Sequence, residues 1–342
     1  MRILLIGGTG LISTAITRLL VERGADDVTL YNRGQTEVRL PYAVNVITGD
    51  RTDFATFEQQ MNDAGAFDCV IDMCCYLADE AESVVHAFSG RIGQYIFTST
   101  VDVYTKPAAY YPVTEHAERK PSSTFAYAFH KAECEEVIHA AHNNSDFLVT
   151  ILRPAYTYGE SRGILHSLGG RTTYIDRIRK GKPIIVHNDG HSFWSACHID
   201  DVARAFVSAV GNRQAYGQAY HVAGEEHLTW DEYHQQVAKA LGAPPPTLVH
   251  IPAALLARAV PKLGAWAELN FQYNNIFDNS AAYNDLHFHY TIPWKQGVQR
   301  TVAWLDARSK VENSDNEPEY DRIIAAWEQH GEGMVEALAD LR

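Results

Sequence analysis

The sequence predicts an α/β protein in which helices cover both faces of a doubly wound parallel sheet. Up to residue 152, short apolar runs alternate with segments of helical periodicity, which is the pattern of consecutive βαβ units. A glycine-rich turn, Gly7 to Gly10, joins the first apolar run to the first helical segment. These two observations together favour an open sheet of parallel strands over a sandwich or a helical bundle.

Each apolar run in the first half is short enough for a strand. Residues 2–6 read Arg-Ile-Leu-Leu-Ile, and a continuous run of this kind is typical of a parallel strand covered on both faces. A helix is expected over 11–23, where apolar residues recur at helical spacing before Gly24 ends it. The further strands are expected at 28–31, 44–47, 69–73, 94–98 and 147–152, and the further helices at 54–64, 81–88 and 129–141.

The pattern becomes irregular after Pro154. Residues 156–170 are rich in Gly, Ser, Tyr and His, which predicts a loop that faces a ligand. Residues 311–318 are acidic and polar and predict a linker, and the last helix has Tyr320 to Trp327 along one face. The other elements expected here are helices at 174–179, 200–210, 230–241 and 298–305, a strand at 183–186 and a turn at 188–190.

Composition argues against several classes of protein. The 342 residues include 29 Lys plus Arg against 42 Asp plus Glu, a net charge of −13, which opposes non-specific binding to nucleic acid. Apolar runs fall short of the roughly 20 residues of a membrane helix, and residues 3–6 are too few for a signal-peptide core. The five cysteines form no CxxC pair, which indicates reduced thiols. We therefore expect a soluble, cytoplasmic protein.

The glycine turn predicts a dinucleotide site. Gly7 and Gly10 hold the first two positions of a GxxGxxG pattern, and the small Ser13 holds the third. Glycines between a strand and a helix let the backbone approach a pyrophosphate, which rests on the helix N-terminus. The strand before and the helix after favour this interpretation over a purely structural turn. The contacts expected from this turn are Gly7, Thr9, Gly10, Leu11 and Ile12.

The end of the second expected strand bears on the choice of nicotinamide cofactor. NAD sites often carry an acidic residue there for the ribose 2′-hydroxyl, whereas this chain has Asn32 and Arg33. Neither repels a 2′-phosphate, so the sequence mildly favours NADP over NAD; an Arg33 that only meets solvent is an equal alternative. Asp50 is expected beside the adenine ring. The remaining expected cofactor contacts are Arg51, Cys74, Ser99 and Pro154.

Tyr127 and Lys131 predict the reactive centre. They are four residues apart and share one face of a helix, where an ammonium lowers the pKa of a phenol from about 10. Tyr127 is then a candidate general acid or base for interconverting a carbinol and a ketone, and Lys131 could also hold the nicotinamide ribose. Thr100, or else Ser99, follows the strand at 94–98 and is expected to hydrogen-bond a substrate oxygen beside Tyr127.

These motifs together resemble the extended short-chain dehydrogenase/reductase family of nucleotide-sugar epimerases and dehydratases, which have Rossmann folds. The likeness covers residues 1–310 and includes Arg153-Pro154, Tyr158-Gly159 and the segment 198–203. It implies a catalytic triad of Thr100, Tyr127 and Lys131, NAD or NADP as cofactor, a small sugar-type substrate and a homodimer.

The resemblance also implies two domains. A Rossmann domain is expected over 1–165, with 191–222 returning to it. A smaller α/β region formed by 166–190 and 223–310 would bind the substrate. Residues 311–342 form the expected C-terminal linker and helix.

Three departures from the family pattern bear on the reaction. Trp194 stands where the family usually has an Arg that holds a diphosphate, which puts a nucleoside-diphosphate sugar in doubt. Dehydratases place an Asp–Glu pair after the catalytic Thr, and here only Asp102 is left. Asp102 could abstract a proton or could simply be a capped or solvated carboxylate. Cys74 and Cys75 replace small residues and are expected to pack as small apolar groups.

We therefore expect an NAD(P)-dependent epimerase, dehydratase or reductase, and the sequence leaves these three open. The main alternative is a non-catalytic protein, because the family includes chloroplast relatives that bind RNA; the charge of −13 opposes it. A metal enzyme is a weaker alternative. His187, His191 and His198 lie in one stretch but lack a ligand spacing such as HExxH, so we expect no metal.

Overall fold

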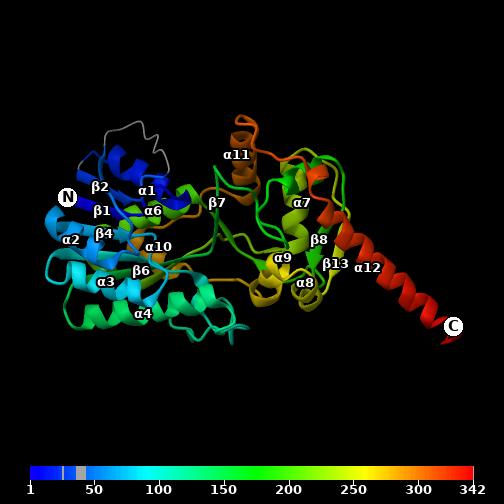
Figure 1. Cartoon of the computed structure of the whole chain (residues 1–342), viewed down its shortest axis with the longest axis horizontal. Helices are drawn as coiled ribbons and strands as arrows, with labels where there is room; N and C mark the ends of the chain where they lie inside the picture. Colours follow the sequence, from blue (N-terminus) through cyan, green and yellow to red (C-terminus); the bar gives the residue numbers. More distant parts are fainter. Residues whose placement is uncertain (25–26, 36–43, 342) are drawn as a thin grey trace. The chain divides into compact units, whose positions relative to one another are not determined.

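Seven strands form one parallel sheet in the order β11-β6-β5-β4-β1-β2-β3 (Figure 1). The computed structural model describes residues 1–24, 27–35 and 44–341, so residue 342 of the expected C-terminal segment lies outside the described residues. The chain divides into two compact units. The first unit comprises Met1–Gly159, Ser195–Glu226 and Ile276–Pro293, and the second comprises Glu160–Trp194, His227–Asn275 and Trp294–Arg342.

The sheet lies in the first unit and confirms the predicted fold class. Six of its strands follow the expected apolar runs, whereas β11 was not expected from the sequence. β11 extends the sheet beyond β6, with Tyr220 paired to Leu152. The strands are β1 Arg2–Ile6, β2 Asp27–Asn32, β3 Asn45–Thr48, β4 Phe67–Asp72, β5 Ile92–Thr98, β6 Leu148–Pro154 and β11 Gln218–Val222.

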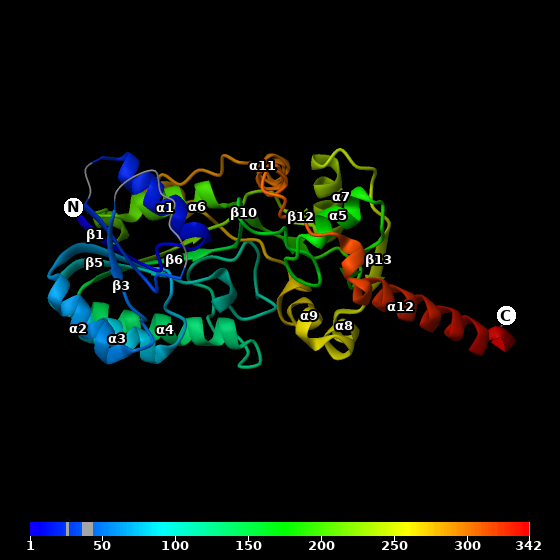
Figure 2. The same ribbon diagram turned by 45° about the horizontal axis from the view of Figure 1, so that its top comes forward.

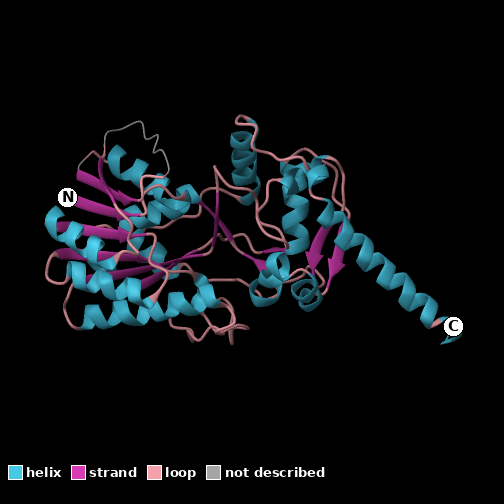
Figure 3. Cartoon of the chain, in the orientation of Figure 1, coloured by secondary structure: helices cyan, strands magenta, loops and turns pink. Residues whose placement is uncertain are grey.

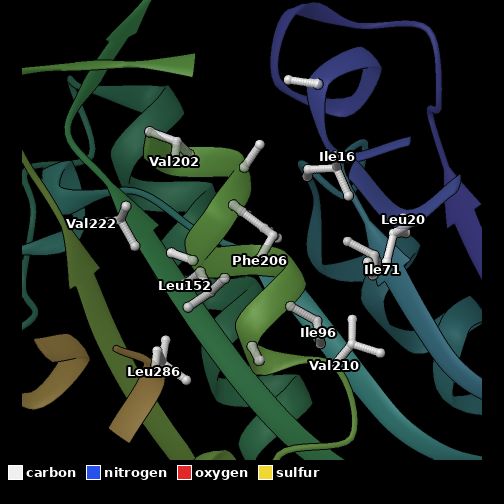
Figure 4. Packing of buried hydrophobic residues seen from close by; sticks show 14 of the residues in the cluster. Ile16, Leu20, Ile71, Ile96, Leu152, Val202, Phe206, Val210, Val222 and Leu286 are labelled. Carbon is white, nitrogen blue, oxygen red and sulfur yellow. The ribbon is translucent and has the colours of Figure 1, made fainter. Parts of the chain in front are cut away.

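Helices cover both faces of this sheet (Figure 3). The side chains of β1 alternate, so that Ile3 and Leu5 enter one buried cluster and Leu4 and Ile6 enter the other. The first cluster packs against α1 and α6, where Phe206 lies over the sheet beside Leu152 (Figure 4). The second cluster packs against α2, α3 and α4. The helices of this unit are α1 Leu11–Glu22, α2 Phe54–Ala64, α3 Ala78–Phe88, α4 Ala126–Asn143, α6 Ile199–Ala209 and α10 Ser280–Leu286.

The helix ends obey local rules that the sequence displays. Gly24 follows α1 with a φ of +71°, and Asp53 caps α2 by accepting a hydrogen bond of 3.3 Å from the Thr56 amide. Helix α4 begins at Ala126, before the expected residue 129. This earlier start places Tyr127 in the first turn of the helix, one turn before Lys131.

The second unit contains short strand pairs and surrounding helices. Strands β8 and β13 are parallel, whereas β9 and β12 are antiparallel. Up to residue 240, the elements of this unit are α5 Thr173–Arg179, β8 Ile184–His187, β9 Phe193–Trp194, β12 Leu228–Thr229 and α7 Trp230–Ala240. The later ones are β13 Leu248–Ile251, α8 Ala253–Ala259, α9 Pro261–Trp266, α11 Trp294–Asp306 and α12 Pro318–Ala337. Beyond Trp327, the residues of α12 are exposed, and both views show this end of the helix away from β8 and β13 (Figure 2).

The expected linker at 311–318 is in fact a packed segment. Ser314 and Glu317 are buried, and the Ser314 amide donates a hydrogen bond of 2.7 Å to Asp176 of α5. The acidic side chains that suggested a solvated linker instead pair with basic ones: Asp315 lies 2.8 Å from Lys180 and 2.6 Å from Lys182. The linker prediction was therefore wrong, because its charges have partners far away in the sequence.

Buried histidines are part of the aromatic core of the second unit. His166 stacks on Tyr174 with ring centroids 4.9 Å apart, and the Tyr174 hydroxyl lies 2.6 Å from Nδ1 of His234. His187 meets Trp230 edge-on at 4.9 Å. Burial lowers the pKa of His166 to about 3 and that of His187 to about 4, and it also lowers the pKa of His234. All three rings are therefore neutral in the folded chain at neutral pH.

Acid should therefore destabilise the second unit before these histidines titrate in the folded state. In the unfolded chain, histidine has a pKa of about 6.5, so below this pH the unfolded chain binds protons that the folded chain excludes. The free energy of unfolding therefore falls by about 1.4 kcal/mol per histidine per pH unit. All six tryptophans of the chain lie in this unit. Urea unfolding followed by tryptophan fluorescence should give a lower free energy of unfolding at pH 5 than at pH 7.

A pair of variants tests the cause of this acid sensitivity. His166→Phe keeps the stack on Tyr174 and should reduce the loss of stability between pH 7 and pH 5. His191 is exposed, so His191→Gln should leave the loss unchanged. Equal pH dependence in wild type and His166→Phe would show that these rings do not cause it.

Candidate active site

The glycine turn between β1 and α1 requires glycine at Gly7. Its φ is +82°, and a Cβ built there would lie 2.1 Å from the Sγ atom of Cys74. Ser13 closes the turn from the inside, because its hydroxyl donates a hydrogen bond of 2.7 Å to the Gly7 carbonyl and accepts one of 2.7 Å from the Gly10 amide. The serine at the third position of the glycine pattern thus has a structural reason. Thr9, Leu11 and Ile12 are partly exposed around the same turn.

Asn32 and Arg33 lie where β2 ends, beside the glycine turn. The Asn32 side-chain oxygen Oδ1 accepts a hydrogen bond of 2.9 Å from the Gly34 amide, while its buried Nδ2 has no partner among the described residues. Arg33 is exposed. Hydrogen bonds from the Thr52 amide and hydroxyl lower the pKa of Asp50, and the positive charge of Arg33 lowers it further. The unpartnered Nδ2 of Asn32 and the nearby guanidinium of Arg33 can bind the hydroxyl or phosphate groups of a nucleotide ribose at this strand end.

Arg51 has a structural position that the sequence did not reveal. Its guanidinium is buried, lies 2.5 Å from the Asp72 carboxylate at the end of β4 and donates a hydrogen bond of 2.8 Å to the Glu80 carbonyl. Asp72 also accepts hydrogen bonds from the Tyr95 hydroxyl, at 2.9 Å, and from the Cys74 amide, at 2.8 Å. Arg51 therefore fixes the loop that carries Cys74 against the glycine turn.

The two cysteines that follow β4 differ in their surroundings. Cys75 is buried in the apolar cluster below α4, as expected for a small apolar group. Cys74 is partly exposed and lies against Gly7. Burial raises the pKa of the Cys74 thiol to about 11. The thiol is therefore protonated at neutral pH and is a weak nucleophile.

Lys131 is buried one turn after Tyr127 in α4. Its ammonium donates hydrogen bonds of 2.7 Å to the Thr98 carbonyl and 2.8 Å to the Cys75 carbonyl. It also lies 4.5 Å from the centre of the Tyr76 ring. Burial lowers its pKa. These two carbonyls attach Lys131 both to the end of β5 and to the loop that borders the glycine turn.

Tyr127 and Thr100 meet at the carboxyl end of β5. Thr100 is the N-cap of a short 3₁₀ turn, Val101–Val103. Its hydroxyl oxygen accepts a hydrogen bond of 3.2 Å from the Asp102 amide, and its side chain lies within hydrogen-bonding reach of Tyr127. Although 36% of Tyr127 is exposed, burial of its hydroxyl, followed by the charge of Asp102, raises the pKa of Tyr127, and the Thr100 side chain opposes the rise. The lowered pKa expected from Lys131 is not found, because carbonyl oxygens hold the ammonium instead. The phenol is therefore protonated at neutral pH.

The side chains of Ser99 and Asp102 have polar partners of their own. The Ser99 hydroxyl donates a hydrogen bond of 2.5 Å to Glu135 in the interior, so Thr100 is the hydroxyl that reaches Tyr127. The Asp102 carboxylate is largely buried and lies 2.8 Å from the ammonium of Lys106. Sequence reasoning missed Lys106, although its position four residues after Asp102 was a signal.

The other singled-out residues lie at separate places. Pro154 ends β6 and pairs with Val222 of β11. Nδ1 of His198 caps α6 by accepting a hydrogen bond of 3.2 Å from the Asp200 amide. In the second unit, Trp194 is buried against Trp230, with ring centres 5.0 Å apart. Within the described part of the chain, no helix has both the length and the apolar character needed to cross a membrane.

The parallel sheet and its glycine turn define a Rossmann-type α/β protein. The chain belongs to the NAD dependent epimerase/dehydratase family, whose model matches residues 3–223. The resemblance to this family that was noted in the sequence is therefore confirmed.

Two curated relatives illustrate the range of this family. The "Chloroplast stem-loop binding protein of 41 kDa b, chloroplastic" of Arabidopsis thaliana is 29% identical over 262 residues, which cover 73% of this chain and 65% of that protein. The chain thus spans just under two thirds of that relative's length. The 2′-dehydrokanamycin reductase of Streptomyces kanamyceticus is 27% identical over 278 residues, covering 81% of this chain and 77% of the reductase.

Solved structures of epimerases share the fold. A UDP-glucuronic acid 4-epimerase from Bacillus cereus, in complex with UDP-glucuronic acid and NAD, has a TM-score of 0.70 at 18% identity, covering 90% of this chain and 99% of the epimerase. A UDP-glucose 4-epimerase from Bifidobacterium longum has a TM-score of 0.71 at 16% identity, covering 91% of this chain and 100% of that epimerase.

Proposed function

We propose that this chain is an NAD(P)-dependent reductase of a keto group on a sugar-type molecule without a diphosphate, with Thr100, Tyr127 and Lys131 as its catalytic residues. The approach of the Thr100 side chain to the Tyr127 hydroxyl, one helical turn from a buried Lys131, carries this proposal. Lys131 is in turn attached through the Cys75 carbonyl to the loop beside Gly7.

The residues around the glycine turn fit a dinucleotide. Gly7 leaves a cradle that a Cβ would fill, and the unpartnered Nδ2 of Asn32 can donate to a ribose oxygen. When bound, the nicotinamide supplies the hydride. Tyr127, protonated at neutral pH, donates a proton to the carbonyl oxygen as it is reduced. Thr100 orients that oxygen, and Lys131 would hold the nicotinamide ribose.

Two observations favour reduction over elimination from a nucleotide sugar. Asp102 is paired to Lys106 at 2.8 Å, so the carboxylate that a dehydratase would use is neutralised by a cation. Trp194 is buried among aromatic rings, where the family usually has the Arg for a diphosphate. The 2′-dehydrokanamycin reductase, a relative over most of both chains, is consistent with a keto sugar as substrate.

The proposal is tested by screening substrates with each cofactor. Purified protein is incubated with NADPH or NADH and a panel of keto sugars, nucleoside-diphosphate sugars and sugar acids, and oxidation of the cofactor is followed by absorbance. We expect turnover with a keto sugar that carries no diphosphate. Protein that binds neither NADPH nor NADH would contradict the proposal.

We also propose that NADP is preferred, because Arg33 is an exposed cation at the ribose end of the site. Arg33→Ala should weaken NADPH binding by about tenfold, as expected for the loss of one charge-assisted hydrogen bond, and leave NADH binding unchanged. Fluorescence titration gives both dissociation constants. Arg213→Ala changes the net charge equally at a distant exposed position and should alter neither; tighter binding of NADH than NADPH by wild type would refute the preference.

RNA binding is the second candidate function, because the stem-loop binding relative is 29% identical. The charge of −13 opposes it. Filter binding to a stem-loop RNA at physiological salt separates the two functions. Retention at that salt by both wild type and Tyr127→Phe would favour RNA binding over the reductase.

A further inference from the structure

The loop that presents Thr100 and Asp102 is held at both of its ends. Ser99 precedes Thr100 at the end of β5, and Tyr104 closes the 3₁₀ turn Val101–Val103. The Ser99 hydroxyl and the Tyr104 ring are buried. The Ser99 hydroxyl and the Tyr104 hydroxyl each form hydrogen bonds with residues outside the loop. One partner of each hydroxyl belongs to the same ion pair.

That ion pair joins Glu135 of α4 to Arg153 of β6. The Arg153 guanidinium donates to both carboxylate oxygens of Glu135, with Nε 2.8 Å from Oε1 and Nη2 2.7 Å from Oε2. Both side chains are buried. Burial opposes ionisation of Glu135, yet Arg153, Ser99 and Arg119 together hold its pKa below the usual range. The pair is therefore charged and bidentate, the most directional arrangement available to these groups.

Each member of the pair holds one end of the loop. Glu135 Oε1 accepts the hydrogen bond of 2.5 Å from Ser99, and Arg153 Nη1 donates one of 2.6 Å to the Tyr104 hydroxyl. That hydroxyl must then donate its own proton to Nε2 of His221, 2.6 Å away. This direction follows because Nδ1 of His221, 2.9 Å from the Asp278 carbonyl, can only donate to it.

We propose that the buried Glu135–Arg153 pair is a clamp that positions Thr100 against Tyr127. Glu135 lies on α4 two turns after Tyr127 and one turn after Lys131, so the helix that carries the phenol and ammonium also fixes the loop that carries the alcohol. The four residues Ser99, Tyr104, Glu135 and Arg153 are positioning residues, and this role rests on the proposed function.

Conservative variants that release one end of the loop test the clamp without leaving a buried charge unpaired. Ser99→Ala frees the first end and Tyr104→Phe frees the second. Tyr220→Phe is the matched control, because it also removes a buried tyrosine hydroxyl from the first unit, one that is bonded to Asp285 at 2.9 Å and to no residue of the loop.

Hydrogen exchange measured by mass spectrometry needs no substrate. In Ser99→Ala and Tyr104→Phe, the peptides that contain residues 99–105 should exchange about fivefold faster, the effect expected for one lost hydrogen bond. The control should leave these peptides unchanged, and both Tyr104→Phe and Tyr220→Phe should bind NADPH as wild type does. Unchanged exchange at 99–105 in both loop variants would overturn the clamp, whether or not a substrate is known.

Kinetics with the substrate found for wild type separate positioning from stability. Ser99→Ala and Tyr104→Phe should each lower kcat about 10- to 100-fold with little change in KM, because a misplaced catalytic group costs about this much. The apparent pKa in the kcat profile should move to higher pH, since the Thr100 side chain favours the phenolate. A wild-type kcat and pH profile in both variants would also overturn the clamp, whereas full activity in Tyr127→Phe would refute only the proposed function.

Discussion

Tyr127→Phe should lower turnover by about 10²- to 10⁴-fold, the contribution expected of a positioned general acid, while dinucleotide binding stays near wild type. The variant removes only the hydroxyl that Thr100 contacts and keeps the ring in the first turn of α4. The measurement is kcat with the substrate found for wild type, together with the dissociation constant of NADPH from fluorescence. Loss confined to kcat is the signature of a group that acts on the transition state.

Tyr110→Phe is the matched control for this variant. Tyr110 lies in the same unit, and 84% of its side chain is exposed, so the loss of its hydroxyl should change neither kcat nor cofactor binding. Near-normal turnover by Tyr127→Phe would remove Tyr127 from the reaction. Lost cofactor binding in that variant would mean that the phenol supports the site structurally instead.

The central strands were predictable because the physics that forms them is local. A strand covered on both faces needs a continuous apolar run, and residues 2–6 or 147–152 display one without reference to any other segment. Strand β11 carries Gln218 and His221 instead of such a run. His221 is buried only because Tyr104 and Asp278 satisfy its ring nitrogens, and no local pattern shows partners so far along the chain.

The packed segment at 311–318 was missed for the same reason. Acidic residues in sequence indicate solvation, yet Asp315 pairs with Lys180 and Lys182 of the second unit. These partners lie more than a hundred residues upstream, and their charges are scattered among other basic residues. Sequence reasoning can count such charges but cannot pair them.

The candidate site divides in the same way between local and distant signals. The spacing of Tyr127 and Lys131 indicated a shared helix face, and α4 carries both. The positions of Arg51 and Glu135 depend on Asp72 and Arg153, which other strands supply. Glu135 did carry a local signal, because it follows Lys131 by one helical turn on the same face.

Gly7→Ala should have the second large effect, because it combines two costs at the cofactor site. A residue with a Cβ at a φ of +82° costs about 1–2 kcal/mol, and the new Cβ would lie 2.1 Å from the Cys74 sulfur, so the Cys74 side chain must rotate or the loop after β4 must move. We expect NADPH binding to weaken at least about 100-fold, since the displaced atoms border the cradle. Fluorescence titration measures binding, and hydrogen exchange in β1 and α1 reports on the stability of the first unit.

The two costs separate in a double-mutant cycle with Cys74→Ala. Removing the sulfur leaves the Cys74 Cβ, 3.4 Å from the new methyl group, as the nearest atom, which is near ordinary van der Waals contact. Gly7→Ala in the Cys74→Ala background should therefore recover at least about tenfold in NADPH affinity and retain only the backbone cost.

Gly24→Ala is the control for that backbone cost: its φ is +71°, and the nearest atom to its Cβ is 4.0 Å away. It lies at the far end of α1 and should weaken the helix without weakening NADPH binding. If Gly7→Ala bound NADPH as wild type does, the turn would not be where the pyrophosphate rests, and the dinucleotide site would have to lie elsewhere.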